Sequence, residues 1–132
     1  MSVVVGFAER PEAERALQVA ADEARLHDLP LHVVHIAKVG VGQDDNESIL
    51  SHRERLSAIE AKYQAEGLDC TAREVFAQGR VSEALIEEAR DRAASLLVIG
   101  IRSRSAVGKL LVGSVAQEVI MGAACPVLSV KP

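Results

Sequence analysis

The residues best suited to chemistry lie in one cationic stretch, residues 100–117, which reads GIRSRSAVGKLLVGSVAQ. The apolar run before it, at 96–99, has the length and composition of a buried parallel strand. The stretch itself carries Arg102, Arg104 and Lys109 and no acidic residue. A strand, a cationic loop and the free N–H groups of a helix N-terminus together form a site for an anion, phosphate above all.

Ser114 stands where the predicted helix begins, directly after Gly113. With Gln117 three residues later it matches a capping box, in which the Ser hydroxyl accepts from a first-turn N–H and the Gln side chain returns to the Ser N–H. A nucleophilic Ser114 at a strand–helix turn is the alternative interpretation. The capping pattern favours the cap, and the sequence contains no nucleophile–base pair.

The four histidines do not suggest a metal site. His32 and His35 are three positions apart on one predicted strand, so their side chains should point to opposite faces. His27 and His52 fall on polar helix surfaces, where we expect solvated side chains. We therefore predict neither a metal centre nor catalytic residues.

The composition is that of one domain spanning residues 1–132, with 48% hydrophobic residues but only 2% aromatic ones. The core must therefore consist of Ala, Val, Leu and Ile. A net charge of −4 argues against a general nucleic-acid binder. No run approaches the ~18 apolar residues of a membrane helix, and the first residues do not resemble a signal peptide. Two cysteines without metal-ligand spacing indicate buried thiols in a cytoplasmic protein.

Apolar runs and helical periodicities alternate along the whole chain. Strands are predicted at 2–7, 31–37, 70–77, 96–99 and 127–131, and helices at 11–26, 49–67, 81–93 and 114–122. Residues 38–47, with two glycines and no periodicity, should form a loop. This alternation predicts an α/β fold: a single open five-stranded parallel sheet with two helices on each face.

Strand hydrophobicity also predicts the strand order 3-2-1-4-5. The first and fourth strands, VVVGF and LLVIG, are the most apolar and belong at the centre, whereas the strand at 70–77 is polar enough for an edge. Ligands of such sheets bind beyond the carboxyl ends of the strands, where the strand order reverses. The loops at that switch point are 8–10 and the cationic stretch. The glycine motifs of dinucleotide-binding and Walker loops are absent.

With these elements in this order, the chain resembles the universal stress protein family over nearly its whole length. The resemblance is carried by VVVGF, by LLVIG, by GKLLVGS and by the closing ACPVLSVK. Nucleotide-binding members of the family carry G-x2-G-x9-G-[ST] after the fourth strand. Gly100, Gly113 and Ser114 match this motif at the correct spacing, and Ser103 replaces its middle Gly.

The end of the first strand also differs from nucleotide-binding members, which usually carry Asp there and Ser two residues later. Here Ala8 and Arg10 occupy those positions. The change removes a polar anchor for a nucleoside and adds a cation, so it favours phosphate over nucleoside.

The resemblance implies a Rossmann-like fold of the HUP type that binds ATP or AMP in the switch-point cleft, with Mg²⁺ only if ATP is bound. The phosphates would lie on the N–H groups that begin the last helix, and Gly100 would leave room for the ribose. The apolar side for adenine would come from Val5, Gly6, Ile36 and Ala37. The implied nucleotide-binding residues are Gly6, Phe7, Ala8, Ile36, Gly100, Arg102, Ser103, Arg104, Gly113, Ser114, Val115 and Ala116.

Two alternative functions stay open. The chain could be a member of the family that binds no nucleotide and acts only through dimer and protein contacts, as Ala8 and Ser103 suggest. It could also be a slow nucleotide hydrolase, for which Glu9 is the only acid in the two loops. The last strand, at 127–131, is too apolar to leave unpaired, which predicts a homodimer through that strand. Family members commonly dimerise this way. We expect no nucleic-acid or membrane partner.

Overall fold

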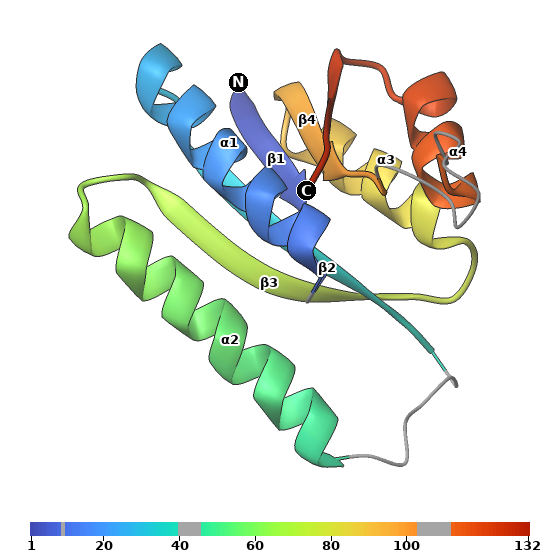
Figure 1. The fold of residues 1–132 in the computed structure, drawn as a ribbon, viewed down its shortest axis with the longest axis horizontal. Coiled ribbons are helices and arrows are strands. Elements are labelled where there is room, and N and C mark those ends of the chain that lie inside the picture. Colours follow the sequence, from blue (N-terminus) through green and yellow to red (C-terminus); the bar gives the residue numbers. More distant parts are fainter. Residues whose placement is uncertain (9, 40–45, 103–111) are drawn as a thin grey trace.

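The structure is a computed structural model that describes residues 1–8, 10–39, 46–102 and 112–132. Strands and helices alternate along it, as the sequence predicts (Figure 1). The elements are β1 (Ser2–Gly6), α1 (Pro11–His27), β2 (Leu31–Lys38), α2 (Asn46–Ala65), β3 (Cys70–Ala77), α3 (Val81–Asp91), β4 (Ala94–Gly100), α4 (Ser114–Gly122) and β5 (Val127–Val130). The predicted loop at 38–47 is shorter at both ends, since β2 and α2 extend into it, and its residues 40–45 lie outside the described residues.

All five strands are parallel and form one sheet in the order β3-β2-β1-β4-β5, which confirms the predicted order. β1 lies at the centre because its side chains are buried on both faces: Val3, Val4 and Val5 are at most 1% exposed. The more polar β3 is an edge strand, as predicted, and β5 is the other edge.

Two helices cover each face of the sheet (Figure 1). α1 and α2 share one aliphatic core, which includes Leu17 and Ile59, and α2 packs chiefly on the edge strand β3. α3 and α4 pack together on the other face, over a core that includes Leu85 and Val119. Within the described residues, every helix is too short or too polar to cross a membrane.

The helix ends follow from local chemistry. Pro11 begins α1, where its missing N–H costs nothing. Asp28 ends α1 in the left-handed conformation, at φ 54°, and its N–H bonds back to carbonyls of the last turn. α3 ends at Asp91, earlier than predicted, and Ala93 beyond it has φ 51° and is exposed. The predicted helix at 81–93 is therefore two residues too long at its end.

Gly100, at the end of β4, lets the first turn of α1 approach the sheet. A Cβ added to Gly100 would lie 2.5 Å from the carbonyl oxygen of Glu12 and 2.9 Å from the nitrogen of Ala13. Both are backbone atoms, which cannot rotate away as a side chain would. The backbone of α1 therefore packs directly on the end of β4, and this contact fixes where α1 begins.

We expect Gly100→Ala to destabilise the fold, because one methyl group would push α1 away from β4. Overpacking of this kind costs about 1–3 kcal/mol of unfolding free energy. Urea unfolding followed by circular dichroism measures the loss. The matched control is Gly79→Ala, whose Cβ would approach only a flexible carboxylate oxygen of Glu83, at 3.6 Å. A Gly100→Ala protein as stable as this control would contradict the contact.

The two cysteines are free thiols that differ in exposure. Cys70, at the start of β3, is 0% exposed, and burial raises the pKa of its thiol to about 11. Cys125, before β5, is half-buried, and burial raises the pKa of its thiol as well. The thiolate form that reacts with electrophiles is therefore scarce at both positions, and at Cys70 it is also inaccessible.

Iodoacetamide should label Cys125 well before Cys70 in the folded protein at about pH 8, because alkylation needs an accessible thiolate. Mass spectrometry of the two cysteine peptides over time measures both rates. In urea, where burial is lost, the two rates should become similar. Equal labelling of both thiols in the folded protein would show that Cys70 is not buried in the core.

Candidate functional site

A cleft of about 590 Å³ lies at the carboxyl ends of the central strands. β1 has β2 on one side and β4 on the other, so the chain leaves β1 and β4 toward opposite faces of the sheet. The ends of β1, β2 and β4 line the cleft together with the first turns of α1, α3 and α4. The volume is within the range of small-molecule sites, about 300–1,000 Å³.

The cleft brings together the residues that the sequence assigns to nucleotide binding. Those that the structure describes all line it: Gly6, Phe7, Ala8, Ile36, Gly100, Arg102, Gly113, Ser114, Val115 and Ala116. Ser103 and Arg104 lie outside the described residues, as does Lys109. Residues from both halves of the chain therefore meet at one end of the sheet.

The N-terminus of α4 borders this cleft, and no side chain of the described residues caps it. Gly113, not Ser114, is the N-cap residue, and it makes no side-chain hydrogen bond to the first turn. The predicted capping box is wrong, because the Gln117 amide donates to the carbonyl oxygen of Val112, at 3.0 Å, instead of returning to Ser114. The first-turn N–H groups thus receive no side-chain acceptor from the described residues, and they form the positive end of the helix dipole.

The two motif glycines provide space for different groups. A Cβ at Gly113 would meet no described atom within 4 Å, so the space beside the first turn of α4 is open. The missing side chain of Gly100 makes room for the backbone of α1, and Gly100 also lines the cleft, so room for a ribose stays a prediction from the family resemblance. Of the two glycines, only Gly113 has a Cβ position that is clear of every described atom.

Alternate residues of β2 supply the apolar side of the cleft. Val34 and Ile36 line it, together with Leu85 of α3. Val5 and Ala37, which the sequence places against adenine, do not line it, and Val5 is fully buried under α1 and α2. An all-apolar strand does not reveal which of its two faces meets the ligand, so the sequence could not show that Val5 of β1 faces α1 and α2 instead of the cleft.

Two exposed arginines, Arg10 and Arg102, line the cleft. Exposed charges are screened by water and salt, so each should contribute about 1 kcal/mol or less to anion binding. The N–H donors of α4 are fixed in place before a ligand arrives, and they should contribute more.

Glu118 is the first acidic residue after the cationic stretch, and its carboxylate is directed to α3. It accepts a hydrogen bond from the Ser82 hydroxyl at 2.8 Å and another from Arg80 at 3.2 Å. The Ser82 bond, with a smaller effect of Arg80, lowers the pKa of Glu118. Its negative charge is thus compensated by these partners and opposes an anion in the cleft less than an unpaired carboxylate would.

Phe7, just beyond β1, offers the cleft mainly its backbone. Phe7 is 5% exposed and belongs to the core under α1 and α2, and its ring centre lies 5.7 Å from the guanidinium carbon of Arg55. Arg55, on α2, also pairs with Glu14 of α1 at 2.9 Å. Ala8 follows Phe7 as a half-buried methyl group. Position 8 therefore offers the cleft a methyl group and no polar side chain.

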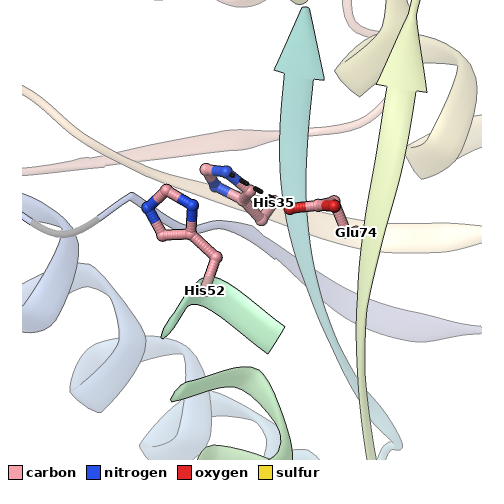
Figure 2. Close-up of side chains that lie close together, drawn as sticks. All are labelled: His35, His52 and Glu74. Carbon is pink, nitrogen blue, oxygen red and sulfur yellow. Dashed lines mark ion pairs between the residues drawn. The ribbon is translucent and has the colours of Figure 1, made fainter. Parts of the chain in front are cut away.

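A second group of side chains adjoins the cleft. The ring centre of His35, on β2, lies 4.8 Å from that of His52 on α2, and Glu74 of β3 lies beside them (Figure 2). The sequence-based expectation of a solvated His52 is wrong, since this side chain is half-buried. His32 contacts Thr71 instead, with ring nitrogen and hydroxyl 2.6 Å apart. The register of β2 on β3 pairs His35 with Glu74, and the packing of α2 on β3 adds His52, so only the tertiary fold reveals this group.

The model of the Universal stress protein family matches residues 1–131. A relative in Thermus aquaticus, described as a universal stress protein in the QAH/OAS sulfhydrylase 3′ region, is 35% identical over 136 aligned residues, 98% of each chain. A solved universal stress protein from Archaeoglobus fulgidus has a TM-score of 0.85 and 36% identity, covering 99% of this chain and 98% of that one.

A second Archaeoglobus fulgidus structure is that of a universal stress protein in complex with dAMP. It has a TM-score of 0.76 and 30% identity, covering 99% of this chain and 98% of that one. The motif after β4, the strand order and these full-length similarities agree, and the chain belongs to the universal stress protein family.

Proposed function

We propose that the chain is a small-molecule binding module that holds an adenine nucleotide in the switch-point cleft. The observation that carries the proposal is the uncapped N-terminus of α4 beside open space at Gly113. Backbone donors held in place by a helix bind phosphate without first having to reorganise. The N–H groups of Ser114 and Val115 would donate to the phosphate oxygens.

The apolar part of a nucleotide would also meet a matching surface. Val34, Ile36 and Leu85 line the cleft together with the polar N-terminus of α4, and a flat base can pack on such side chains. The Archaeoglobus fulgidus protein solved with dAMP, 30% identical to this chain, supports an adenine nucleotide over other phosphate compounds.

Within this proposal the ligand is AMP or ATP, with Mg²⁺ accompanying only ATP. Ala8 gives the nucleoside no polar anchor, whereas Arg10 and Arg102 add positive charge at the cleft. Most of the binding free energy should therefore come from the phosphates. Bound and free forms would then differ at the α4 end of the cleft, and through this difference the protein would act as a stress-response regulator.

Gly113→Val should weaken AMP and ATP binding at least about tenfold, because the added side chain fills the space beside the first turn of α4. Losing one hydrogen bond to a charged group costs about 1.5–3 kcal/mol, which corresponds to this factor or more. The backbone at Gly113, with φ −65° and ψ 162°, is extended, so valine fits it without strain. Calorimetry at low salt measures both affinities.

The matched control is Gly79→Val, at a position outside the cleft whose Cβ would approach only the Glu83 carboxylate, at 3.6 Å. Its nucleotide affinity should equal that of the unmutated protein. Circular dichroism melting of both variants checks that α4 remains folded. Unchanged binding in folded Gly113→Val would place the phosphate away from α4.

The methyl group of Ala8 favours a second candidate function, in which the protein binds no nucleotide and acts only through dimer and protein contacts. Native mass spectrometry of the purified protein separates the two functions. Co-purified AMP or ATP would support nucleotide binding. Protein that purifies without nucleotide, and that gives no heat of binding in calorimetry even at about millimolar AMP or ATP, would support the second function.

We also propose that two copies of the chain pair through β5. The N–H of Ile101 donates to the carbonyl oxygen of Val130 at 2.8 Å, so the peptide groups of Val130 face β4. Peptide groups alternate in direction along a strand, and those of Ser129 therefore point out of the sheet edge. Antiparallel pairing about a two-fold axis would give these groups partners and would cover an apolar edge.

Ser129→Pro should convert the dimer to a monomer, because proline removes the outward N–H while the hydrogen bonds between β4 and β5 stay intact. Ser129→Ala keeps that N–H and serves as the control. Analytical ultracentrifugation at micromolar concentration measures the mass of each. A monomeric unmutated protein would contradict the dimer, and a dimeric Ser129→Pro would place the interface elsewhere.

A further inference from the structure

His35, His52 and Glu74 come from three different elements and meet at the carboxyl end of β2. His35 and Glu74 are direct neighbours in the parallel register of β2 and β3, and His52 reaches them from α2 (Figure 2). One nitrogen or oxygen atom from each residue lies within 4.8 Å of those of the other two. Two imidazoles and a carboxylate are therefore held together by the tertiary fold, not by closeness in sequence.

The orientation of His35 leaves one ring nitrogen free to bind a cation. Its Nδ1 lies 2.9 Å from the carbonyl oxygen of Phe7, which can only accept, so Nδ1 carries the proton and donates it. In the neutral ring the lone pair is then on Nε2, which is 3.9 Å from the Glu74 carboxylate. Histidines that ligate metals usually donate their other N–H to a carbonyl or carboxylate in this way.

Glu74 provides an independent indication of a missing partner. Its side chain is only 8% exposed, and its Oε1 is buried without a hydrogen bond from any residue that the structure describes. A buried charge without partners is costly. An ion pair with protonated His35, at 3.9 Å through Oε2, is too long for a hydrogen bond and leaves Oε1 unsatisfied.

We propose that His35, His52 and Glu74 bind a divalent transition-metal cation, Zn²⁺ being the best match to two imidazole nitrogens and one carboxylate oxygen. Zn–N bonds of about 2.0–2.1 Å in a tetrahedral site place ligand atoms about 3.3 Å apart, so the three side chains must close by side-chain rotation. The metal neutralises Glu74 and leaves a fourth position for water.

This site is distinct from the proposed phosphate position. His35 lines the cleft, but His52 and Glu74 do not, and the α4 N-terminus contributes nothing to the cluster. Gly113→Val should therefore weaken nucleotide binding at least about tenfold without changing metal affinity. The two proposals can fail independently.

The test uses the full chain after chelator treatment and dialysis. Calorimetry with Zn²⁺ and absorption spectra with Co²⁺ should both show about one ion bound per chain, as expected for one three-ligand site. His52→Ala and Glu74→Gln should each weaken Zn²⁺ binding more than about tenfold, since even the loss of an outer partner costs 10–100-fold.

His27→Ala is the matched control. His27 also lies beside a glutamate, with its Nε2 3.3 Å from Glu23, but this pair is on one exposed helix face and has no third ligand in the described residues. Its removal should leave Zn²⁺ binding unchanged. Binding that survives both His52→Ala and Glu74→Gln, or that His27→Ala removes, would overturn the proposal, as would no binding by the unmutated protein.

NMR of the histidine ring nitrogens in the unmutated protein tests the site without requiring that any variant folds. Zn²⁺ should shift the Nε2 resonance of His35 while its Nδ1 stays protonated, because Nδ1 donates to Phe7. Shifts confined to His27 or His32 would overturn the assignment.

Discussion

The contact between the first turn of α1 and the end of β4 is the constraint on which the cleft depends. Because Gly100 has no side chain, the backbone of α1 lies directly on the sheet, and α1 begins at the cleft. The chain after β4 then continues to α4 on the other face, so the two loops at the switch point diverge around the same space. A Cβ at this position would separate α1 from β4 and widen that space.

Much of this architecture can be predicted from the sequence, because parallel strands covered on both faces are recognisable as continuous apolar runs. VVVGF and LLVIG identify the two central strands, and the polar residues of the strand at 70–77 identify an edge. These patterns depend on burial, and the number of consecutive apolar residues in a strand reflects its burial.

Features that depend on where a side chain points, or on which element packs against it, could not be predicted in the same way. Ser114 and Gln117 match a capping box in sequence, but the helix begins one residue earlier than that pattern requires, and Gln117 bonds to Val112. Gly100 satisfies a nucleotide motif, yet its space is filled by another helix. His52 falls on a polar helix surface, and only the packing of α2 on β3 brings it to His35.

The packing of α2 on an edge strand has a consequence for how the protein opens. α2 contacts the rest of the molecule chiefly through β3, and β3 pairs with a single neighbour, β2. Such a peripheral pair can separate as one cooperative unit at a lower free energy than the centre of the sheet, so its amides exchange with solvent before those of β1 and β4. His52 and Glu74 belong to this unit and His35 does not. A cation held by all three residues would therefore bind only when α2 and β3 are packed on the sheet. The concentration of the cation would then set how often α2 and β3 separate from it.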